Sequence, residues 1–178
     1  QMSTAGKEAS RTGTMNFRMN GALTIGTFAG ANIEIRDEVG AENFFLFGLT
    51  AAEVEATHAH YNPRRLIEQD SDLQRVMHLL ECGHFNQFEP GIFDDILASL
   101  KSPQDPWLTL ADFRGYIDAQ KRVEQLWRLP LICSRMRFFY WTRMSILNTA
   151  ASGKFSSDRT IAEYNRDIWK LAPITADS

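Results

Sequence analysis

Apolar and polar positions divide the chain into two regions. Residues 1 to about 50 combine short apolar runs with many Gly, Ser, Thr and Ala residues, whereas later apolar positions recur mostly at helical spacing. In the first region, Leu23–Gly26 and Phe44–Phe47 are runs typical of short buried strands. Asn32 can cap a helix between them that ends at Gly40. The order strand, helix, strand predicts a parallel α/β unit.

The second region predicts several amphipathic helices. Their apolar stripes cover residues 73–80, 92–100, 113–127 and 161–168. Two strands against roughly five or six helices give an α/β, helix-rich fold class. Two strands cannot form a stable open parallel sheet alone, so further strands are expected outside this chain. Core positions are expected at Met77, Phe113 and Trp127, and capping oxygens for the last helix at Ser156, Ser157 and Asp158.

Composition and charge are those of an ordinary globular domain. Of the 178 residues, 44% are hydrophobic and 23% charged. The net charge of −3 and the lack of a basic cluster predict no nucleic-acid partner. The most apolar stretch, residues 129–141, is interrupted by two arginines and is shorter than the ~20 residues of a membrane span. With no signal-peptide pattern either, we expect a cytoplasmic protein without a membrane partner.

Cysteine, histidine and acidic residues indicate no metal or catalytic pair. Cys82 and Cys133 have no paired spacing, which favours free thiols over a disulfide. His58 and His60 match no strong ligand pattern. The neighbouring acids are typical of helix starts or solvated faces: Asp70 with Asp72, and Asp94 with Asp95.

The segment Ser3–Thr14 is the one loop whose composition suits a ligand. Its small residues allow backbone N–H groups to turn toward an anion, and a helix over residues 16–22 would add the positive end of its dipole. Thr12 and Gly13 are the expected phosphate contacts, and Glu8 can bind sugar hydroxyls. A plain linker or turn has the same composition, and there is no P-loop lysine and no dinucleotide fingerprint.

Longer motifs are similar to those of a known family. Ser3–Ser10 followed by Thr12–Gly13 resembles the active-site segment of the glycogen/starch (α-1,4-glucan) phosphorylases. The resemblance implies that residues 1–178 are the later part of the C-terminal Rossmann-like domain of a GT-B fold, without the N-terminal domain. It also implies pyridoxal phosphate as cofactor, α-1,4-glucan and phosphate as substrates, glucose 1-phosphate as product, and a homodimeric parent protein. Further matching segments are Asn20–Thr27, Gly30–Asn32, Ala111–Phe113, Ser145–Asn148 and Ser152–Ile161.

Carried over residue by residue, the resemblance assigns ligand contacts within the Ser3–Thr14 segment. Glu8 and Ser10 match positions that hold the terminal glucose, and Thr12 and Gly13 match those whose amides hold the cofactor phosphate. Arg11 stands where the family has glycine, and its guanidinium either crowds the site, the favoured reading, or binds an anion itself.

Asn16 stands where the family has its Schiff-base lysine. An amide nitrogen is not nucleophilic and cannot form that bond, so no catalytic residue is intact. Arg18 is at the wrong position to replace the lysine. Thr14 and Ala29 also depart from the family's asparagine and aspartate. Three readings follow: a fragment inactive alone, a degenerate module that binds sugar phosphate or a protein, and a parent enzyme that holds its cofactor non-covalently.

Residues 129–140 form a longer connection than the family has between its conserved Arg and Trp-Thr-Arg positions. The segment reads as an insertion, a shifted reading frame or a sequencing error. A helix that starts after Pro130 and packs against the core is about as consistent with its composition as disorder is.

Overall fold

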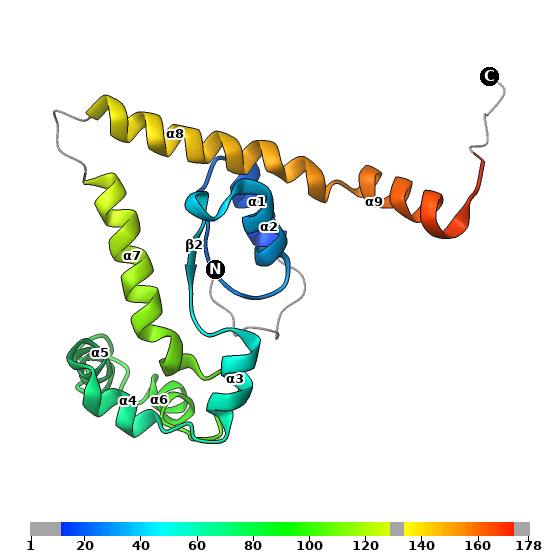
Figure 1. Cartoon of the computed structure of the whole chain (residues 1–178). Helices are drawn as coiled ribbons and strands as arrows, with labels where there is room; N and C mark the ends of the chain where they lie inside the picture. The colour runs from blue at the N-terminus through cyan, green and yellow to red at the C-terminus, as the bar shows by residue number, and fades with distance from the viewer. Residues whose placement is uncertain (1–11, 129–133, 173–178) are drawn as a thin grey trace.

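The computed structural model describes residues 12–128 and 134–172 (Figure 1). Its centre is a parallel pair of strands, β1 (Ile25–Thr27) and β2 (Phe45–Phe47), in the register Ile25 to Phe45. Helix α2 (Ala31–Val39) makes the crossover between them. The predicted parallel unit and the helix-rich α/β class are therefore confirmed. A GT-B fold remains a prediction.

The start of α2 differs from the prediction, whereas its end agrees. Gly30, at φ 47°, precedes the helix in place of Asn32. Asn32 is inside the first turn and 1% exposed, and its Nδ2 donates to the Thr27 carbonyl at 2.9 Å. Asn32 therefore joins the helix to the end of β1 and does not cap it. Gly40 ends α2 at φ 88°, as expected of a glycine in this position.

Helix α1 (Thr12–Met19) begins before the predicted residues 16–22 and ends earlier. The chain reverses immediately afterwards, where the Gly21 N–H donates to the Arg18 carbonyl at 2.9 Å. Gly21 has φ 83°, a conformation that side chains with a Cβ rarely adopt, so the helix cannot continue through it. The prediction of a helix here is confirmed, but its predicted bounds were wrong at both ends.

Two long helices enclose the sheet. Helix α7 (Phe113–Trp127) lies alongside β2, where the rings of Phe47 and Tyr116 meet edge to face with centroids 5.4 Å apart (Figure 1). Helix α8 (Ser134–Ala150) lies across α1 and continues into the short 3-10 helix η4 (Ala151–Phe155). Ile35, Val39 and Phe44 form the core cluster of this part.

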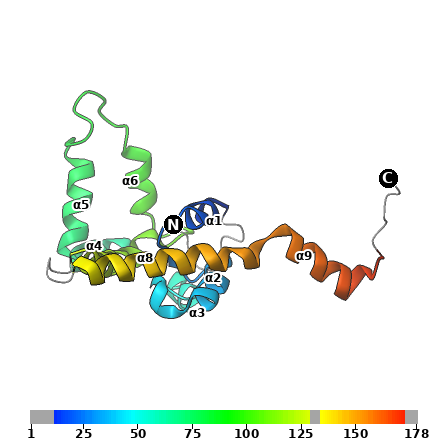
Figure 2. The same cartoon turned by 90° about the horizontal axis from the view of Figure 1, so that it is seen from above.

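Four shorter helices form the rest of the body. They are α3 (Ala51–His58), α4 (Pro63–Gln69), α5 (Ser71–Glu81) and α6 (Asp94–Leu100), and α5 and α6 project together as a hairpin (Figure 2). Leu73, Met77 and Leu110 make a second core cluster, which confirms Leu73 and Met77 of the stripe predicted for residues 73–80, whereas Val76 in that stripe is 41% exposed. The predicted helix-start acids are also confirmed: Asp70 caps α5, and Asp94 and Asp95 lie in the first turn of α6.

The C-terminal residues lead away from the sheet. Ser156 caps α9 (Ser157–Tyr164) through the Arg159 N–H, as predicted, and the π-helical turn η5 (Asn165–Trp169) follows. Figures 1 and 2 both show this segment projecting from the body. The remaining 3-10 turns are η1 (Ala41–Asn43) and η2 (Thr109–Asp112).

Three expectations about helices and burial were wrong. Nine α-helices occur within the described ranges, against the five or six expected. The sequence missed α3 and α4, whose apolar stripes are weak, and α8, which lies partly in the segment 129–140. Trp127 is 57% exposed and is no core residue. Residues 134–140 are helical, in agreement with one of the two readings, but Phe138 and Phe139 are 73% and 62% exposed and do not pack against the core.

Candidate functional site

The carboxyl ends of the two strands define one edge of the sheet. β1 ends before α2 and β2 ends before α3, so both helices begin at this edge. A reversal at Asn20–Gly21 joins α1 to the segment that leads into β1. Ligands of open parallel sheets bind outside the carboxyl ends of the strands. The starts of α2 and α3 therefore lie at the edge where a ligand site is expected.

Of these helix starts, α3 carries a full side-chain cap. The Thr50 hydroxyl accepts from the Glu53 N–H at 3.3 Å, and the Glu53 carboxylate accepts from the Thr50 N–H at 2.8 Å. These bonds lower the pKa of the Glu53 carboxyl and place a negative charge at this end. At α2, Gly30 offers no side chain, and Asn32 Oδ1 is buried without a hydrogen-bond partner. An anion is thus disfavoured at α3.

The first turn of α1 contains the predicted phosphate contacts, Thr12 and Gly13. The first N–H groups of a helix have no acceptor within the helix, and they lie at the positive end of its dipole. A Cβ built on Gly13 would meet no heavy atom within 4 Å, so the space beside this backbone is open. Of the other predicted ligand residues, Glu8, Ser10 and Arg11 lie outside the described residues.

Asn16 lies one turn further along α1. It follows Gly13 by three positions. Its side chain is exposed, and its backbone carbonyl accepts a hydrogen bond from Asn20 Nδ2 at 2.8 Å. Thr12, Gly13 and Asn16 thus lie within the first two turns of α1, with an amide at the third position.

Arg18 occupies the opposite side of the helix, and the sequence did not indicate its role. It is 1% exposed, and its Nε and Nη2 donate to Asn148 Oδ1 at 3.2 Å and to the Asn148 carbonyl at 3.1 Å. Its guanidinium also lies 5.8 Å from the centroid of the Phe155 ring. Within the described part of the chain no carboxylate pairs with Arg18, and burial lowers its pKa. The buried charge is held by neutral groups.

Asn148 connects α1 to several other segments. Its Oδ1 also accepts from Thr24 Oγ1 at 3.3 Å, and its Nδ2 donates to the carbonyls of Met144 at 2.9 Å and Asn43 at 3.4 Å. The side chain is 0% exposed. One amide on α8 therefore fixes α1, the entry to β1 and η1 relative to one another. Asn148 belongs to a segment that matches the phosphorylases, but nothing in its spacing indicates these partners.

A pocket of about 400 Å³ separates α1 from the segment that leads into β1. Gly13 lines it and Asn16 does not, so these two predicted contacts face different sides of α1. The lining residues are Gly13, Thr14, Phe17, Arg18 and Ala22–Ile25.

Comparisons with known proteins identify the family. The family model described as carbohydrate phosphorylase matches residues 1–171. This chain belongs to the carbohydrate phosphorylase family. Glycogen phosphorylase from Synechocystis sp. is 51% identical over 178 residues, which are 99% of this chain. The muscle form from Bos taurus is 45% identical over 97% of the chain, and glycogen phosphorylase from Chlamydia pneumoniae is 44% identical over 96%.

The chain spans only 20% of the length of these phosphorylases. A sheet of two strands with exposed apolar residues around it is what a part of a larger protein would show, because two strands alone are only marginally stable. In the ranges 12–128 and 134–172 no three His, Cys, Asp or Glu residues are grouped to hold a metal ion. No helix there is long and apolar enough to cross a membrane.

The phosphate and the aldehyde of the phosphorylases' pyridoxal phosphate can each be compared with the residues of α1. An open helix start, with a glycine that leaves room beside the backbone, suits a phosphate group. An amide at position 16 does not suit an aldehyde, because its nitrogen lone pair is delocalised into the carbonyl. The residues of α1 thus fit one end of the cofactor and not the other.

Proposed function

We propose that this chain is the later part of the cofactor-binding domain of an α-1,4-glucan phosphorylase. The complete enzyme would transfer the terminal glucose of the glucan to inorganic phosphate and release glucose 1-phosphate. The observation that carries the proposal is the open first turn of α1, where Thr12 and Gly13 of the matching sequence motif lie. Family membership supports the same reaction class.

Each predicted site residue has a role in this proposal. Thr12 and Gly13 hold the cofactor phosphate through their backbone N–H groups, and Glu8 and Ser10 bind the terminal glucose. Arg11 narrows the approach to the site. Pyridoxal phosphate would supply an acid–base group through its phosphate; no step involving it is assigned to Asn16.

The isolated chain is proposed to be inactive, because it spans only 20% of the length of its relatives. The rest of the protein would supply the N-terminal domain and the remaining ligand contacts. The whole protein is proposed to be a homodimer, and a cytoplasmic location stays a prediction from the sequence.

A chimera tests the proposal. This chain replaces the matching segment of the Synechocystis glycogen phosphorylase, once unchanged and once with Asn16→Lys. We expect the Asn16→Lys chimera to release glucose 1-phosphate from glycogen and phosphate, and the isolated 178-residue chain to release none. A folded Asn16→Lys chimera without activity would contradict the proposed function, with the unmodified relative as the positive control.

A further inference from the structure

Arg18 carries a buried positive charge whose contacts are all neutral. Its side chain is 1% exposed, and it donates from Nε to Asn148 Oδ1, from Nη2 to the Asn148 carbonyl and from Nη1 to Met15 Sδ. A guanidinium has five N–H groups. Among the residues that the structure describes, only three of the five have an acceptor, and one of these acceptors is a sulfur 3.6 Å away. Two N–H groups therefore remain available.

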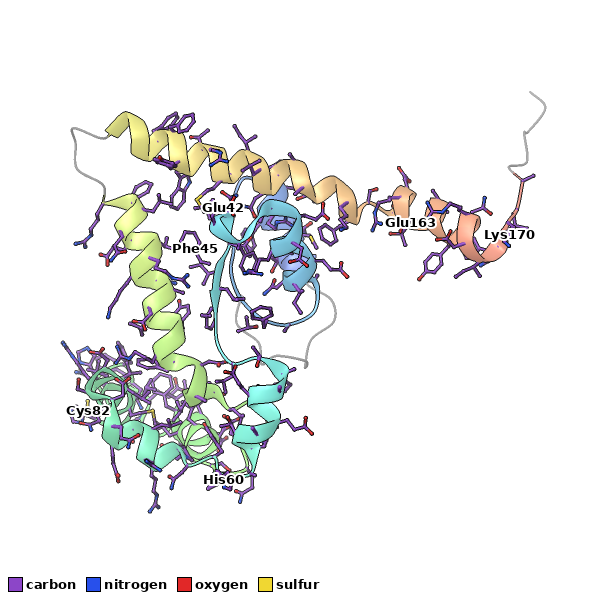
Figure 3. All side chains as sticks on the ribbon, in the orientation of Figure 1. Glu42, Phe45, His60, Cys82, Glu163 and Lys170 are labelled. Atoms are coloured by element: carbon purple, nitrogen blue, oxygen red, sulfur yellow. The ribbon has the colours of Figure 1, made fainter. Side chains whose placement is uncertain are left out.

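Carboxylates on the surrounding elements are bound elsewhere. Glu42 lies on η1 beside α8, and its Oε1 accepts from Asn43 Nδ2 at 3.0 Å (Figure 3). Glu38 on α2 pairs with Lys154 of η4, and Glu163 on α9 pairs within its own helix. A negative charge that compensates the buried guanidinium would thus come from outside the described part of the chain.

The pocket beside α1 leads to this charge. Of its lining residues, Gly13 and Phe17 are exposed, Phe17 to 71%. Thr14, Arg18 and Thr24 also line it and are 8%, 1% and 4% exposed. The exposed pair therefore marks the mouth of the pocket, and the guanidinium lies toward its floor.

The rest of the lining suits an apolar ligand. Phe17 and the segment Ala22–Ile25 contribute aromatic and aliphatic side chains, and the Thr24 hydroxyl already donates to Asn148 Oδ1 at 3.3 Å. The volume of about 400 Å³ lies within the range of roughly 300–1,000 Å³ that is usual for small-molecule sites. Such sites are mostly apolar, with a few polar groups that fix the orientation of the ligand.

A carboxylate matches the available donors better than a phosphate does. It presents two oxygens to the two N–H groups, and its single negative charge equals the charge of one guanidinium. A phosphate dianion would need a second cation, and no lysine or further arginine is among the described residues that line the pocket. Arg18 lies in the last turn of α1, so this pairing does not depend on the start of the helix.

We propose that this pocket binds a small apolar monocarboxylate, whose acid group pairs with Arg18 and whose body packs against Phe17, Leu23 and Ile25. The proposal goes beyond the proposed function and does not depend on it. Burial lowers the pKa of Arg18, because the charged form is desolvated with only neutral partners. A carboxylate at the two available N–H groups would stabilise that charged form.

The experiment titrates the full 178-residue chain with 3-phenylpropionate. 3-Phenylpropionamide has the same shape without the charge and is the control ligand. Calorimetry measures both affinities, and NMR shifts of the Arg18 Nε–H and of the amides of residues 22–25 locate the site. We expect saturable binding of the acid, about tenfold to a hundredfold tighter than that of the amide, as a charge-assisted hydrogen bond provides.

Three variants test the two parts of the pocket. Arg18→Met removes the charge and keeps a long apolar side chain, so the preference for the acid should disappear. Phe17→Ala removes an exposed wall and should weaken both ligands about fivefold or more, with the preference kept. Met19→Ala is its control, because Met19 is 55% exposed on the same helix and does not line the pocket. It should leave both affinities unchanged.

Four results would overturn the proposal. They are no saturable binding or equal affinity for acid and amide, a preference for the acid that survives in Arg18→Met, displacement of the acid by inorganic phosphate or pyridoxal phosphate, and loss of acid binding in the chimera of the previous section. Displacement would make the pocket part of the cofactor site, and loss in the chimera would show that the rest of the protein fills it. Release of glucose 1-phosphate by the chimera is measured separately, so this proposal and the proposed function can fail independently.

Discussion

The buried contact between Arg18 and Asn148 offers the sharpest test of how α1 is held. Asn148→Ala removes the acceptor of the Arg18 Nε and of Thr24 Oγ1, and the donor to the Met144 carbonyl. The Asn148 backbone carbonyl still accepts from Arg18 Nη2. The variant therefore leaves a buried guanidinium with one of its two oxygen acceptors.

The expected loss follows from these bonds. A hydrogen bond to a charged group contributes about 1.5–3 kcal/mol, and a buried neutral one about 1 kcal/mol. The freed groups are shielded from bulk water, since Asn148 is 0% exposed and Arg18 1%. Asn148→Ala should therefore lower the free energy of unfolding by about 3–5 kcal/mol, as when a buried charge loses its partner.

The second arm of the test removes the charge instead. Arg18→Met keeps a long apolar side chain beside Phe155 and leaves Asn148 Oδ1 bonded to Thr24. Replacing a buried charge by an apolar side chain of similar volume often costs little, so this variant should lose less than about 2 kcal/mol. With Arg18→Met already present, Asn148→Ala should lose about 1.5 kcal/mol less than it does alone.

Urea denaturation followed by circular dichroism measures the four free energies of unfolding by linear extrapolation. Hydrogen exchange at the α1 amides reports the same coupling if the chain unfolds in more than one step. The reasoning is refuted if Asn148→Ala costs under about 1 kcal/mol, or if the coupling energy is below about 0.5 kcal/mol.

Two further predictions concern local structure. Asp70 caps α5 and bonds Arg114, which lowers the pKa of the Asp70 carboxyl; Asp70→Ala should cost about 1–2 kcal/mol near neutral pH. A lowered folded pKa contributes stability above the unfolded pKa, so denaturation at falling pH should show the difference disappear in acid. Gly21→Ala should cost about 1–3 kcal/mol, because Gly21 has φ 83° and a Cβ there would lie 2.8 Å from Ser145 Oγ. Gly153→Ala, with no heavy atom within 4 Å of the added Cβ, is its control and should change the unfolding free energy by less than about 0.5 kcal/mol.

Local pattern was a good guide where each residue's role depends on its near neighbours. The two apolar runs became parallel strands, Gly40 ended α2, and Asp70 and Ser156 capped their helices. The motifs around Ser3–Gly13 pointed to the phosphorylases, and the match of residues 1–171 to the family model confirmed that assignment.

Burial was the part that local pattern predicted least well. Trp127 lies on a well-formed amphipathic stripe, yet it is exposed, and its ring meets that of Trp141 on α8 edge to face with centroids 5.4 Å apart. The helices α3 and α4 were missed because their apolar positions have little periodicity; α3 depends on its capping box and α4 on Pro63 at its first turn.

Positions 16 and 18 show most clearly what the sequence determined and what the tertiary structure decided. The sequence by itself determined that α1 carries an amide where the family has an amine, since that is a matter of which atoms are present. Only the tertiary structure decided what Arg18 does, because its partner Asn148 is 130 residues away and no local pattern encodes a contact over that separation. Periodicity and caps report on neighbours within a turn, whereas the orientation of a helix is set by what packs against it from elsewhere in the chain.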